Sequence, residues 1–257
     1  MLLVADVGNT NTTVGVFDGH HLRVSWRLTS RREQTADEYG VFIEMLLQTR
    51  GIPAQEITAI AISNVVPPVQ QTLEWMAEKY FGRTPFFVEP GVNTGMPLAV
   101  DNPKEVGPDR VLAAVGGATF YGTPLIVVDF GTATTFSCVN ARGEFIGGAI
   151  APGLGISVDA LLTRAARLAR VELVCPPQAI GRDTTTNIQS GVVYGWAGLV
   201  DGLVERMRQE MGTQATVAAT GGLVSLISGV SRSIQHVNSD LKLEGLRLLW
   251  ERAGGVH

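Results

Sequence analysis

The stretch that decides the fold is MLLVADVGNTNTTVGVFDG at residues 1–19, and PLIVVDFGTATTFSCVNARG at residues 124–143 repeats its pattern. In each copy an apolar run ends on an aspartate, Asp6 or Asp129, a glycine follows two places later, and small hydroxyl and amide side chains come next. The apolar runs predict buried strands, and the glycine-containing segments predict tight turns into a second strand. The repeat predicts two similar α/β domains that share one cleft.

The turn in each copy is suited to binding phosphate. Backbone N–H groups and hydroxyls gather there, and no bulky side chain blocks the approach of a ligand. An aspartate would repel phosphate directly, so its natural role is to hold Mg²⁺, usually through water. One Asp-x-Gly-x-Thr segment alone is more often an ordinary turn, but two in matching contexts favour a pair of phosphate loops that grip one polyphosphate from opposite sides.

Composition argues against several other classes of protein. With 257 residues, of which 45% are hydrophobic, the chain can form one large or two modest domains. Only 17% of residues are charged and the formal net charge is −4, so we expect no nucleic-acid partner. The longest apolar runs are too short for a membrane span, and MLLVA lacks the basic start of a secretory signal, so a cytoplasmic location is expected. Two cysteines are too few for a disulfide framework or a cysteine-based zinc site.

Strand and helix signals alternate in a similar way in both halves. The first half predicts strands at 2–7, 12–19, 22–28 and 57–63 and helices at 35–51 and 68–80. The second half predicts strands at 125–130, 136–139, 144–151 and 215–222 and helices at about 154–170, 184–211 and 241–255. Between the halves, the turn-rich segment 89–110 is either a functional loop or an interdomain cover.

The first predicted helix has a clear start signal. Thr35 and Glu38 have the spacing of a capping box, in which each side chain satisfies a backbone N–H. Behind it runs an i, i+4 apolar stripe of the kind that faces a core. Its members are Val41, Phe42, Met45 and Leu46.

Several motifs, in order along the chain, resemble a known family. The segments 6–12, 129–135 and 219–222 (DVGNTNT, DFGTATT and ATGG) resemble the two phosphate loops and the adenosine loop of the acetate kinase, sugar kinase, Hsp70 and actin superfamily. Within it, EVGPDR, GGAIAPGLGIS and GRDTTTNIQSG resemble type III pantothenate kinase, at 105–110, 147–157 and 181–191.

This resemblance implies a fold and an activity. The fold would be α/β, with duplicated ribonuclease H-like (actin-like ATPase) domains whose mixed sheets are flanked by helices, at 1–116 and at 117–257, the second including a dimerisation helix. The activity would be ATP-dependent phosphorylation of pantothenate to 4′-phosphopantothenate, the first step of coenzyme A biosynthesis.

The resemblance also implies a role for each matching residue. Asp6 would hold the Mg²⁺ of ATP, Asp129 would bind a monovalent cation (K⁺ or NH4⁺), and Asp109 would be the catalytic base. Gly221 and Gly222 would let adenosine lie close to the backbone. The other nucleotide contacts would be Val7, Gly8, Asn9, Thr10, Asn11, Thr12, Thr13 and Thr132. The other pantothenate contacts would be Val100, Gly107, Pro108, Arg110 and Thr184. In a homodimer the partner subunit would supply Thr184, so that the active site is shared.

The requirements of phosphoryl transfer agree with these roles. The reaction needs positioning, charge neutralisation and an acceptor for the proton of the alcohol. Asp109 comes at the end of a loop beside Arg110, where a carboxylate can face a cleft and a guanidinium can bind an anionic substrate. Taken alone, the pair would be an ordinary helix start. The sequence lacks the GxxxxGK[ST] motif of P-loop enzymes and the motif set of protein kinases.

Three departures from the family pattern bear on substrate affinity rather than on reaction type. Pro108 stands where alanine is usual, Val100 stands where tyrosine is frequent, and GRDTTT at 181–186 replaces GRNTVE. Two alternatives stay open. One is a kinase for another small hydroxy acid or a sugar, and the other is a non-catalytic regulatory protein related to the Bvg accessory factor.

Overall fold

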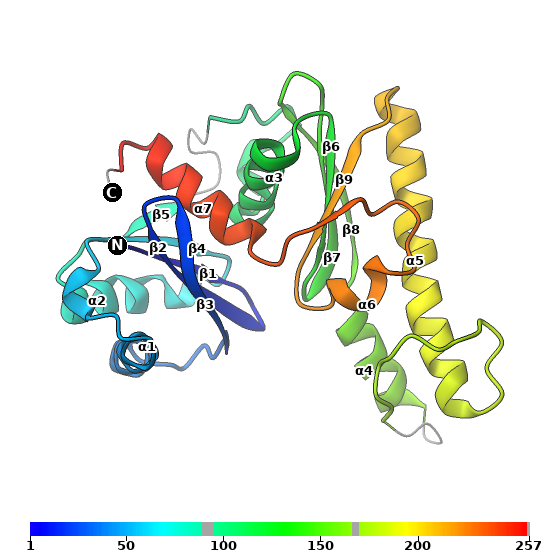
Figure 1. The fold of residues 1–257 in the computed structure, drawn as a ribbon, viewed down its shortest axis with the longest axis horizontal. Helices are drawn as coiled ribbons and strands as arrows, with labels where there is room; N and C mark the ends of the chain where they lie inside the picture. The colour runs from blue at the N-terminus through cyan, green and yellow to red at the C-terminus, as the bar shows by residue number, and fades with distance from the viewer. Residues whose placement is uncertain (89–94, 166–169, 256–257) are drawn as a thin grey trace. The chain divides into compact units, whose positions relative to one another are not determined.

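The computed structural model describes residues 1–88, 95–165 and 170–255 and forms two compact units (Figure 1). The first unit comprises Met1–Pro97, Asp101–Gly116 and Asp240–His257, and the second comprises Leu98–Val100 and Gly117–Ser239. The C-terminal segment therefore belongs to the first unit, whereas the sequence placed it in a second domain at 117–257. The reason is packing, because the last helix lies against the first sheet.

The first unit is built on a five-stranded mixed sheet with the order β3-β2-β1-β4-β5. β2 pairs antiparallel with both β1 and β3, whereas β4 pairs parallel with both β1 and β5. The strands are β1 (Leu2–Val7), β2 (Asn11–Asp18), β3 (His21–Thr29), β4 (Ala59–Asn64) and β5 (Phe86–Val88). The helices are α1 (Ala36–Thr49), α2 (Gln70–Phe81), α3 (Pro108–Tyr121), which continues into the second unit, and α7 (Leu241–Arg252). Short 3-10 turns lie at Ala54–Glu56, Pro67–Val69 and Pro103–Glu105.

The central strand β1 is buried on both faces. Leu3, Ala5 and Val7 point into a core formed with α1 and α2. On the opposite face lies α7, since a Cβ atom on Gly15, the register partner of Val4, would lie 2.9 Å from Leu243 Cδ1. Asp6 is two residues beyond Val4, so it faces α7.

The apolar stripe predicted for α1 is not the buried one. The capping box of Thr35 and Glu38 is confirmed, but Val41, Phe42 and Met45 are exposed. The buried face is formed instead by Tyr39, Gly40, Ile43 and Leu47. Two apolar stripes compete in this helix, and α2 decides between them, because a Cβ on Gly40 would overlap the ring of Tyr80.

The second unit repeats the strand arrangement of the first. Its sheet has the order β10-β9-β6-β7-β8, with β6, β7 and β8 antiparallel and β9 and β10 parallel to their neighbours. The strands are β6 (Leu125–Phe130), β7 (Ala133–Val139), β8 (Phe145–Pro152), β9 (Thr216–Thr220) and β10 (His236–Val237). The helices are α4 (Leu154–Arg164), α5 (Thr184–Met211) and α6 (Val224–Ser228).

Helix α5 covers one face of this second sheet (Figure 1). Its bounds agree with the prediction for residues 184–211, and buried valines of α5 share a core with Ile126 and Val128. Helix α4 ends at Arg164, earlier than predicted, and residues 166–169 of that prediction lie outside the described residues. Residues 89–94 of the predicted loop also lie outside them. No helix within the described ranges is long and apolar enough to span a membrane.

Candidate active site

Asp6 is held in a frame of three strands. It is only 4% exposed, and its register partners are Thr13 on β2 and Ser63 on β4. Residues opposite one another in a sheet project from the same face, so the carboxylate lies between two hydroxyl side chains. Within the described part of the chain, Asp6 Oδ1 and Ser63 Oγ are buried and have no hydrogen-bond partner. Buried polar atoms are rarely left unpaired, so the site can accept an added polar ligand or hydrated cation.

A tight turn follows Asp6. Gly8 N–H donates to the Asn11 carbonyl at 3.0 Å, and a Cβ on Gly8 would lie 2.9 Å from that oxygen. The turn exposes Asn9, Thr10 and Asn11 to solvent. Their exposed amide and hydroxyl groups are of the kind that a phosphate loop presents to a ligand.

Val7 and Thr12 lie on the other face of the sheet. Val7 belongs to the core under α1 and α2, and Thr12 is its register partner. The Thr12 hydroxyl is buried and shares a hydrogen bond of 2.8 Å with Ser30. Among the nucleotide contacts predicted at 7–13, these two point away from Asp6.

A lysine of α7 approaches Asp6 from the facing helix. Lys242 Nζ lies 2.9 Å from Asp6 Oδ2, and the two side chains are 23% and 5% exposed. The ion pair is therefore largely shielded from water, where an electrostatic interaction is stronger than at the surface.

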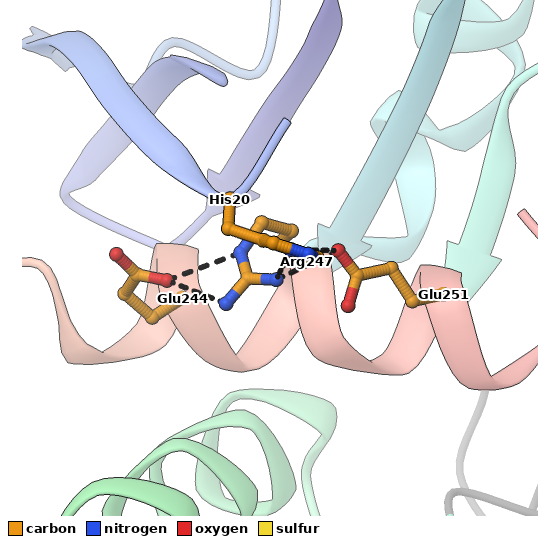
Figure 2. A network of polar contacts seen from close by, with 4 residues as sticks. All are labelled: His20, Glu244, Arg247 and Glu251. Carbon is orange, nitrogen blue, oxygen red and sulfur yellow. Dashed lines mark hydrogen bonds and ion pairs between the residues drawn. The ribbon is translucent and has the colours of Figure 1, made fainter. Parts of the chain in front are cut away.

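Arg247 of helix α7 is the centre of a network with His20, Glu244 and Glu251, as Figure 2 shows. Arg247 is 6% exposed and donates to Glu244 at 3.1 and 3.2 Å and to Glu251 at 2.7 Å. It also contacts His20 Nδ1, in the β2–β3 turn, at 3.0 Å and lies 5.5 Å from the centre of the Phe17 ring. Burial raises the pKa of Glu244, although hydrogen bonds from Arg247 oppose the rise. The network joins α7 to the β2–β3 hairpin.

Asp109 lies in the first turn of α3. A Cβ on Gly107 would lie 2.6 Å from Asp109 Oδ1, so the glycine leaves room for the carboxylate. The Gly107 carbonyl accepts hydrogen bonds from Arg110 N–H and Val111 N–H at 3.1 and 3.3 Å. Pro108 is the first helical residue, where an N–H has no partner within the helix, so this departure from the family pattern is accommodated.

Asp129 has hydroxyl residues as register partners in the second unit, as Asp6 has in the first. Its register partners are Thr135 on β7 and Thr220 on β9, and Thr220 Oγ1 is buried with no hydrogen-bond partner in the described ranges. Gly221 has a φ of +98°, and a Cβ there would collide with Asp129 Oδ1 and the Phe130 backbone.

A further glycine packs on the turn after Asp129. A Cβ on Gly153 would collide with the Thr132 carbonyl. Thr132 and Gly222 are both exposed beside these contacts. Segments of three separate motifs, at 129–135, 147–157 and 219–222, therefore meet around Asp129 and the turn that follows it.

The segment around Val100 lies beside β8. Ala99 N–H donates to the Phe145 carbonyl at 2.8 Å, and a Cβ on Gly147 would lie 3.9 Å from Val100 Cγ1. Gly147 has a φ of +110°, which side chains rarely tolerate. Val100 therefore lies next to the glycine-containing strand β8.

Thr184 is the first residue of α5 and is exposed. Asp183 caps the helix, since its carboxylate accepts from Thr186 N–H at 2.8 Å, and this hydrogen bond lowers the pKa of Asp183. The Thr186 hydroxyl contacts the Asp183 backbone N–H in return, which explains the GRDTTT departure as a matched capping box. Thr184 lines a groove of about 460 Å³ between α4 and α5. Its other lining residues are Ser157, Val158, Leu161, Asn187, Ile188, Gly191, Val192 and Trp196.

Comparison with known proteins decides the family. The family model described as type III pantothenate kinase matches residues 2–206. A protein of that name from Anaeromyxobacter sp. (strain K) is 51% identical over 98% of this chain and 99% of its own length. One from Syntrophotalea carbinolica is 50% identical over 99% of this chain and 100% of its own. This chain belongs to the type III pantothenate kinase family.

Solved structures share the fold of this family member. A structure described as a Baf family transcriptional activator from Campylobacter jejuni is 18% identical, with a TM-score of 0.61, over 99% of this chain and 100% of that one. Component A of (R)-2-hydroxyglutaryl-CoA dehydratase from Acidaminococcus fermentans is 13% identical, with a TM-score of 0.58, over 99% of each chain. The predicted α/β fold with two mixed sheets flanked by helices is confirmed.

The predicted site residues belong to different units of the structure. Asp6, Asp109 and Arg110 lie in the first unit, and the remaining charged position, Asp129, lies in the second with Thr184. Ser63 and Thr220 were not among the residues predicted from the sequence, where the only signal is a hydroxyl residue at the end of a parallel strand. Lys242 and Arg247 were not among them either, because their helix was assigned to the wrong half of the chain.

Proposed function

We propose that this chain phosphorylates pantothenate with ATP, giving 4′-phosphopantothenate in the first step of coenzyme A biosynthesis. The observation that carries the proposal is the buried Asp6, whose Oδ1 has no hydrogen-bond partner among the described residues. The chain also has relatives named type III pantothenate kinase that are 50–51% identical to it over nearly its whole length. The repetition of a hydroxyl-flanked aspartate at Asp129 supports a phosphate-binding role for the turn that follows it.

Asp6 is assigned the Mg²⁺ of the nucleotide. A hard cation prefers carboxylate oxygens, and the buried Oδ1 of Asp6 fits that requirement. When bound, Mg²⁺ supplies neutralisation of the β- and γ-phosphate charge. The exposed residues Asn9, Thr10 and Asn11 are assigned to the phosphates, and Gly221 and Gly222 to the adenosine.

Asp109 is assigned the role of proton acceptor for the alcohol of pantothenate. It is half-buried at a helix start, so it is both held in place and accessible. Arg110 is adjacent and supplies a guanidinium that can bind the carboxylate of pantothenate. Asp129 is assigned a monovalent cation, K⁺ or NH4⁺, which would offset repulsion between this carboxylate and the triphosphate.

The proposed enzyme is a homodimer in which helix α5 forms the interface between the subunits. Gly191, Gly195, Gly198 and Gly202 lie along this helix, all are exposed, and a Cβ at any of them would meet open space. Glycine in an exposed helix costs about 1 kcal/mol relative to alanine, so four of them on one helix favour a second helix packed closely there. Thr184, at the start of α5, would then reach pantothenate bound by the partner subunit.

A coupled ADP-release assay with purified protein, Mg²⁺ and either K⁺ or NH4⁺ tests the function. We expect ADP to be released only when pantothenate is present, with product mass that of 4′-phosphopantothenate. Glucose and pantoate serve as matched acceptors for the alternative of a sugar or hydroxy-acid kinase. ADP release with glucose or pantoate and none with pantothenate would show that the protein is a kinase for another substrate. No ADP release with any of the three acceptors, with either cation, would overturn the proposal that the protein is a kinase.

A further inference from the structure

The ion pair between Lys242 and Asp6 differs from the surface pairs of the same unit. Lys79 and Asp37 form a similar contact at 2.7 Å, but their side chains are 62% and 59% exposed. Lys242 and Asp6 are 23% and 5% exposed at 2.9 Å. Surface pairs of the first kind contribute little to stability, whereas a shielded pair is retained against a larger cost of desolvation. The shielded pair therefore calls for an explanation by function.

The backbone that carries Lys242 cannot easily move. Its neighbours Leu241 and Leu243 are 0% and 1% exposed. A Cβ on Gly116 of α3 would lie 2.6 Å from the Leu241 carbonyl, and a Cβ on Gly245 would collide with the Leu112 carbonyl. Helix α7 is thus in close contact with α3 on one side and with the sheet on the other. Only the flexible end of the lysine side chain is left to respond to a ligand.

The carboxylate that Lys242 contacts has unused capacity. Lys242 meets Oδ2, while Oδ1 is buried with no hydrogen-bond partner among the described residues, and so is Ser63 Oγ on the neighbouring strand. The exposed turn from Gly8 to Asn11 begins two residues after Asp6. A cation, an unsatisfied anionic oxygen and a donor-rich turn therefore occur together.

We infer that Lys242 is a phosphate ligand of the nucleotide, and that by neutralising Asp6 it makes the site select a metal–nucleotide complex over the free metal ion. The inference rests on the proposed function. A free divalent cation meets a carboxylate whose charge is already offset by an ammonium group. A metal-bound triphosphate brings its own negative charge, to which the ammonium group can turn while Asp6 turns to the metal.

The test compares Lys242→Met with Lys79→Met, the matched change in the surface pair. Mn²⁺ is the probe, because it takes oxygen ligands as Mg²⁺ does and its free concentration is measured by electron paramagnetic resonance. Binding of Mn²⁺ alone is measured first, and binding of Mn²⁺ with a non-hydrolysable ATP analogue is measured by calorimetry.

We expect Lys242→Met to weaken binding of the metal–nucleotide complex by roughly 10- to 100-fold, the usual contribution of one hydrogen bond to a charged group. The same variant should bind Mn²⁺ alone more tightly than wild type does. Lys79→Met should change neither value. A folded Lys242→Met variant that binds both ligands as wild type does would overturn the inference and leave a structural ion pair.

A measurement on the wild-type protein covers the case in which Lys242→Met fails to fold. Lysine acylation is followed by mass spectrometry in the absence of ligand, with Mg²⁺ alone, and with Mg²⁺ and the ATP analogue. Lys242 should be protected only by the metal–nucleotide complex, while Lys79 should react equally in all three. If Lys242 is labelled equally with and without the bound metal–nucleotide complex, the inference is overturned but the proposed function is not. If the wild-type protein does not bind the ATP analogue, the proposed function is overturned as well.

Discussion

Asp6 in the first unit and Asp129 in the second have hydroxyl residues opposite them on both neighbouring strands. The two sheets have equivalent strand orders. The other neighbours of the two aspartates differ, because a lysine of α7 approaches Asp6, whereas the backbone at Gly221 closes over Asp129. The two units therefore share the arrangement of strands around the aspartate, but they differ in the group that contacts the carboxylate.

The helices that cover the two sheets differ in the same way. Helix α7 is joined to the first sheet by the buried charges of Arg247 and its partners. Helix α5 covers the second sheet with a row of buried valines, including Val193, Val200 and Val204. Helix α7 thus adds a buried charged network to apolar contacts such as that of Leu243 with Gly15, whereas α5 packs mainly through apolar side chains. The predictions below concern the two units and the residues in which they differ.

The largest effect is expected for Asp109→Asn, which removes the proposed proton acceptor of the first unit. The two side chains have nearly the same shape, so fold and nucleotide binding should survive while turnover falls by roughly 10²–10⁴-fold. The matched control is Asp183→Asn, the same change at a helix start of the second unit, where an amide can still cap the helix. Steady-state kinetics and thermal unfolding of both variants give the answer. An Asp109→Asn enzyme that keeps more than about a third of wild-type kcat would reduce Asp109 to a helix-start residue.

The second prediction is that Asp109 and Thr184, which lie in different units of the fold, act on one substrate from different subunits of a dimer. If Asp109 and Thr184 serve one substrate from two subunits, mixing inactive Asp109→Asn and Thr184→Arg proteins creates heterodimers with one intact site. Random pairing in a two-fold dimer restores about a quarter of wild-type activity. Activity is measured after subunit exchange has been demonstrated by mass spectrometry. No recovery after exchange, or a monomer by light scattering, would contradict the shared site.

Arg247→Met tests the charged anchor of α7. The change leaves the carboxylates of Glu244 and Glu251 without their buried partner, so the free energy of unfolding should fall by about 3–5 kcal/mol. The control is Arg23→Met, which removes the surface pair with Asp18 and should cost less than about 1 kcal/mol. Chemical denaturation measures both. Equal losses in the two variants would mean that the network of Figure 2 contributes no more than a surface ion pair.

The two aspartates should respond differently to monovalent cations. Asp129→Asn should lose the stimulation of activity by K⁺ or NH4⁺ over a buffer that contains neither, because the carboxylate that holds the ion is gone. The residual activity of Asp6→Asn should still be stimulated by K⁺ or NH4⁺. This variant should instead need a higher Mg²⁺ concentration to reach half of its maximal activity. Titrations of each variant with both ions distinguish the roles. A wild-type enzyme equally active without K⁺ or NH4⁺ would remove the cation role of Asp129.

The smallest effect concerns the titration of Glu244. Burial raises its pKa above the ordinary value of 4.5, so the folded state holds this proton more tightly than the unfolded state does. The stabilisation is complete below pH 4.5 and is lost as pH rises through the raised pKa of the folded state. The free energy of unfolding of wild type, relative to Glu244→Gln, should therefore decrease across that window and be constant above it. A relative stability that increases with pH there would mean that Arg247, not burial, dominates.

Local pattern was sufficient for most of the secondary structure. The hairpin after β1, the bounds of α5 and the Thr35 capping box all follow from short-range signals and are present in the structure. The buried face of α1 could not be predicted in the same way. Two apolar stripes satisfy the helical period, and only the contact of Gly40 with Tyr80 of α2 selects one.

The sequence by itself determined the family, because family membership depends on short motifs with fixed spacing. The same motifs predict the two phosphate loops and the roles of Asp6, Asp109 and Asp129. Tertiary structure alone decided that the last helix returns to the first sheet and brings Lys242 to Asp6. The physical reason is that a helix's apolar stripe requires burial but does not specify the sheet that buries it. That choice comes from close fits such as Gly15 with Leu243 and Gly116 with Leu241, which join residues far apart in the chain.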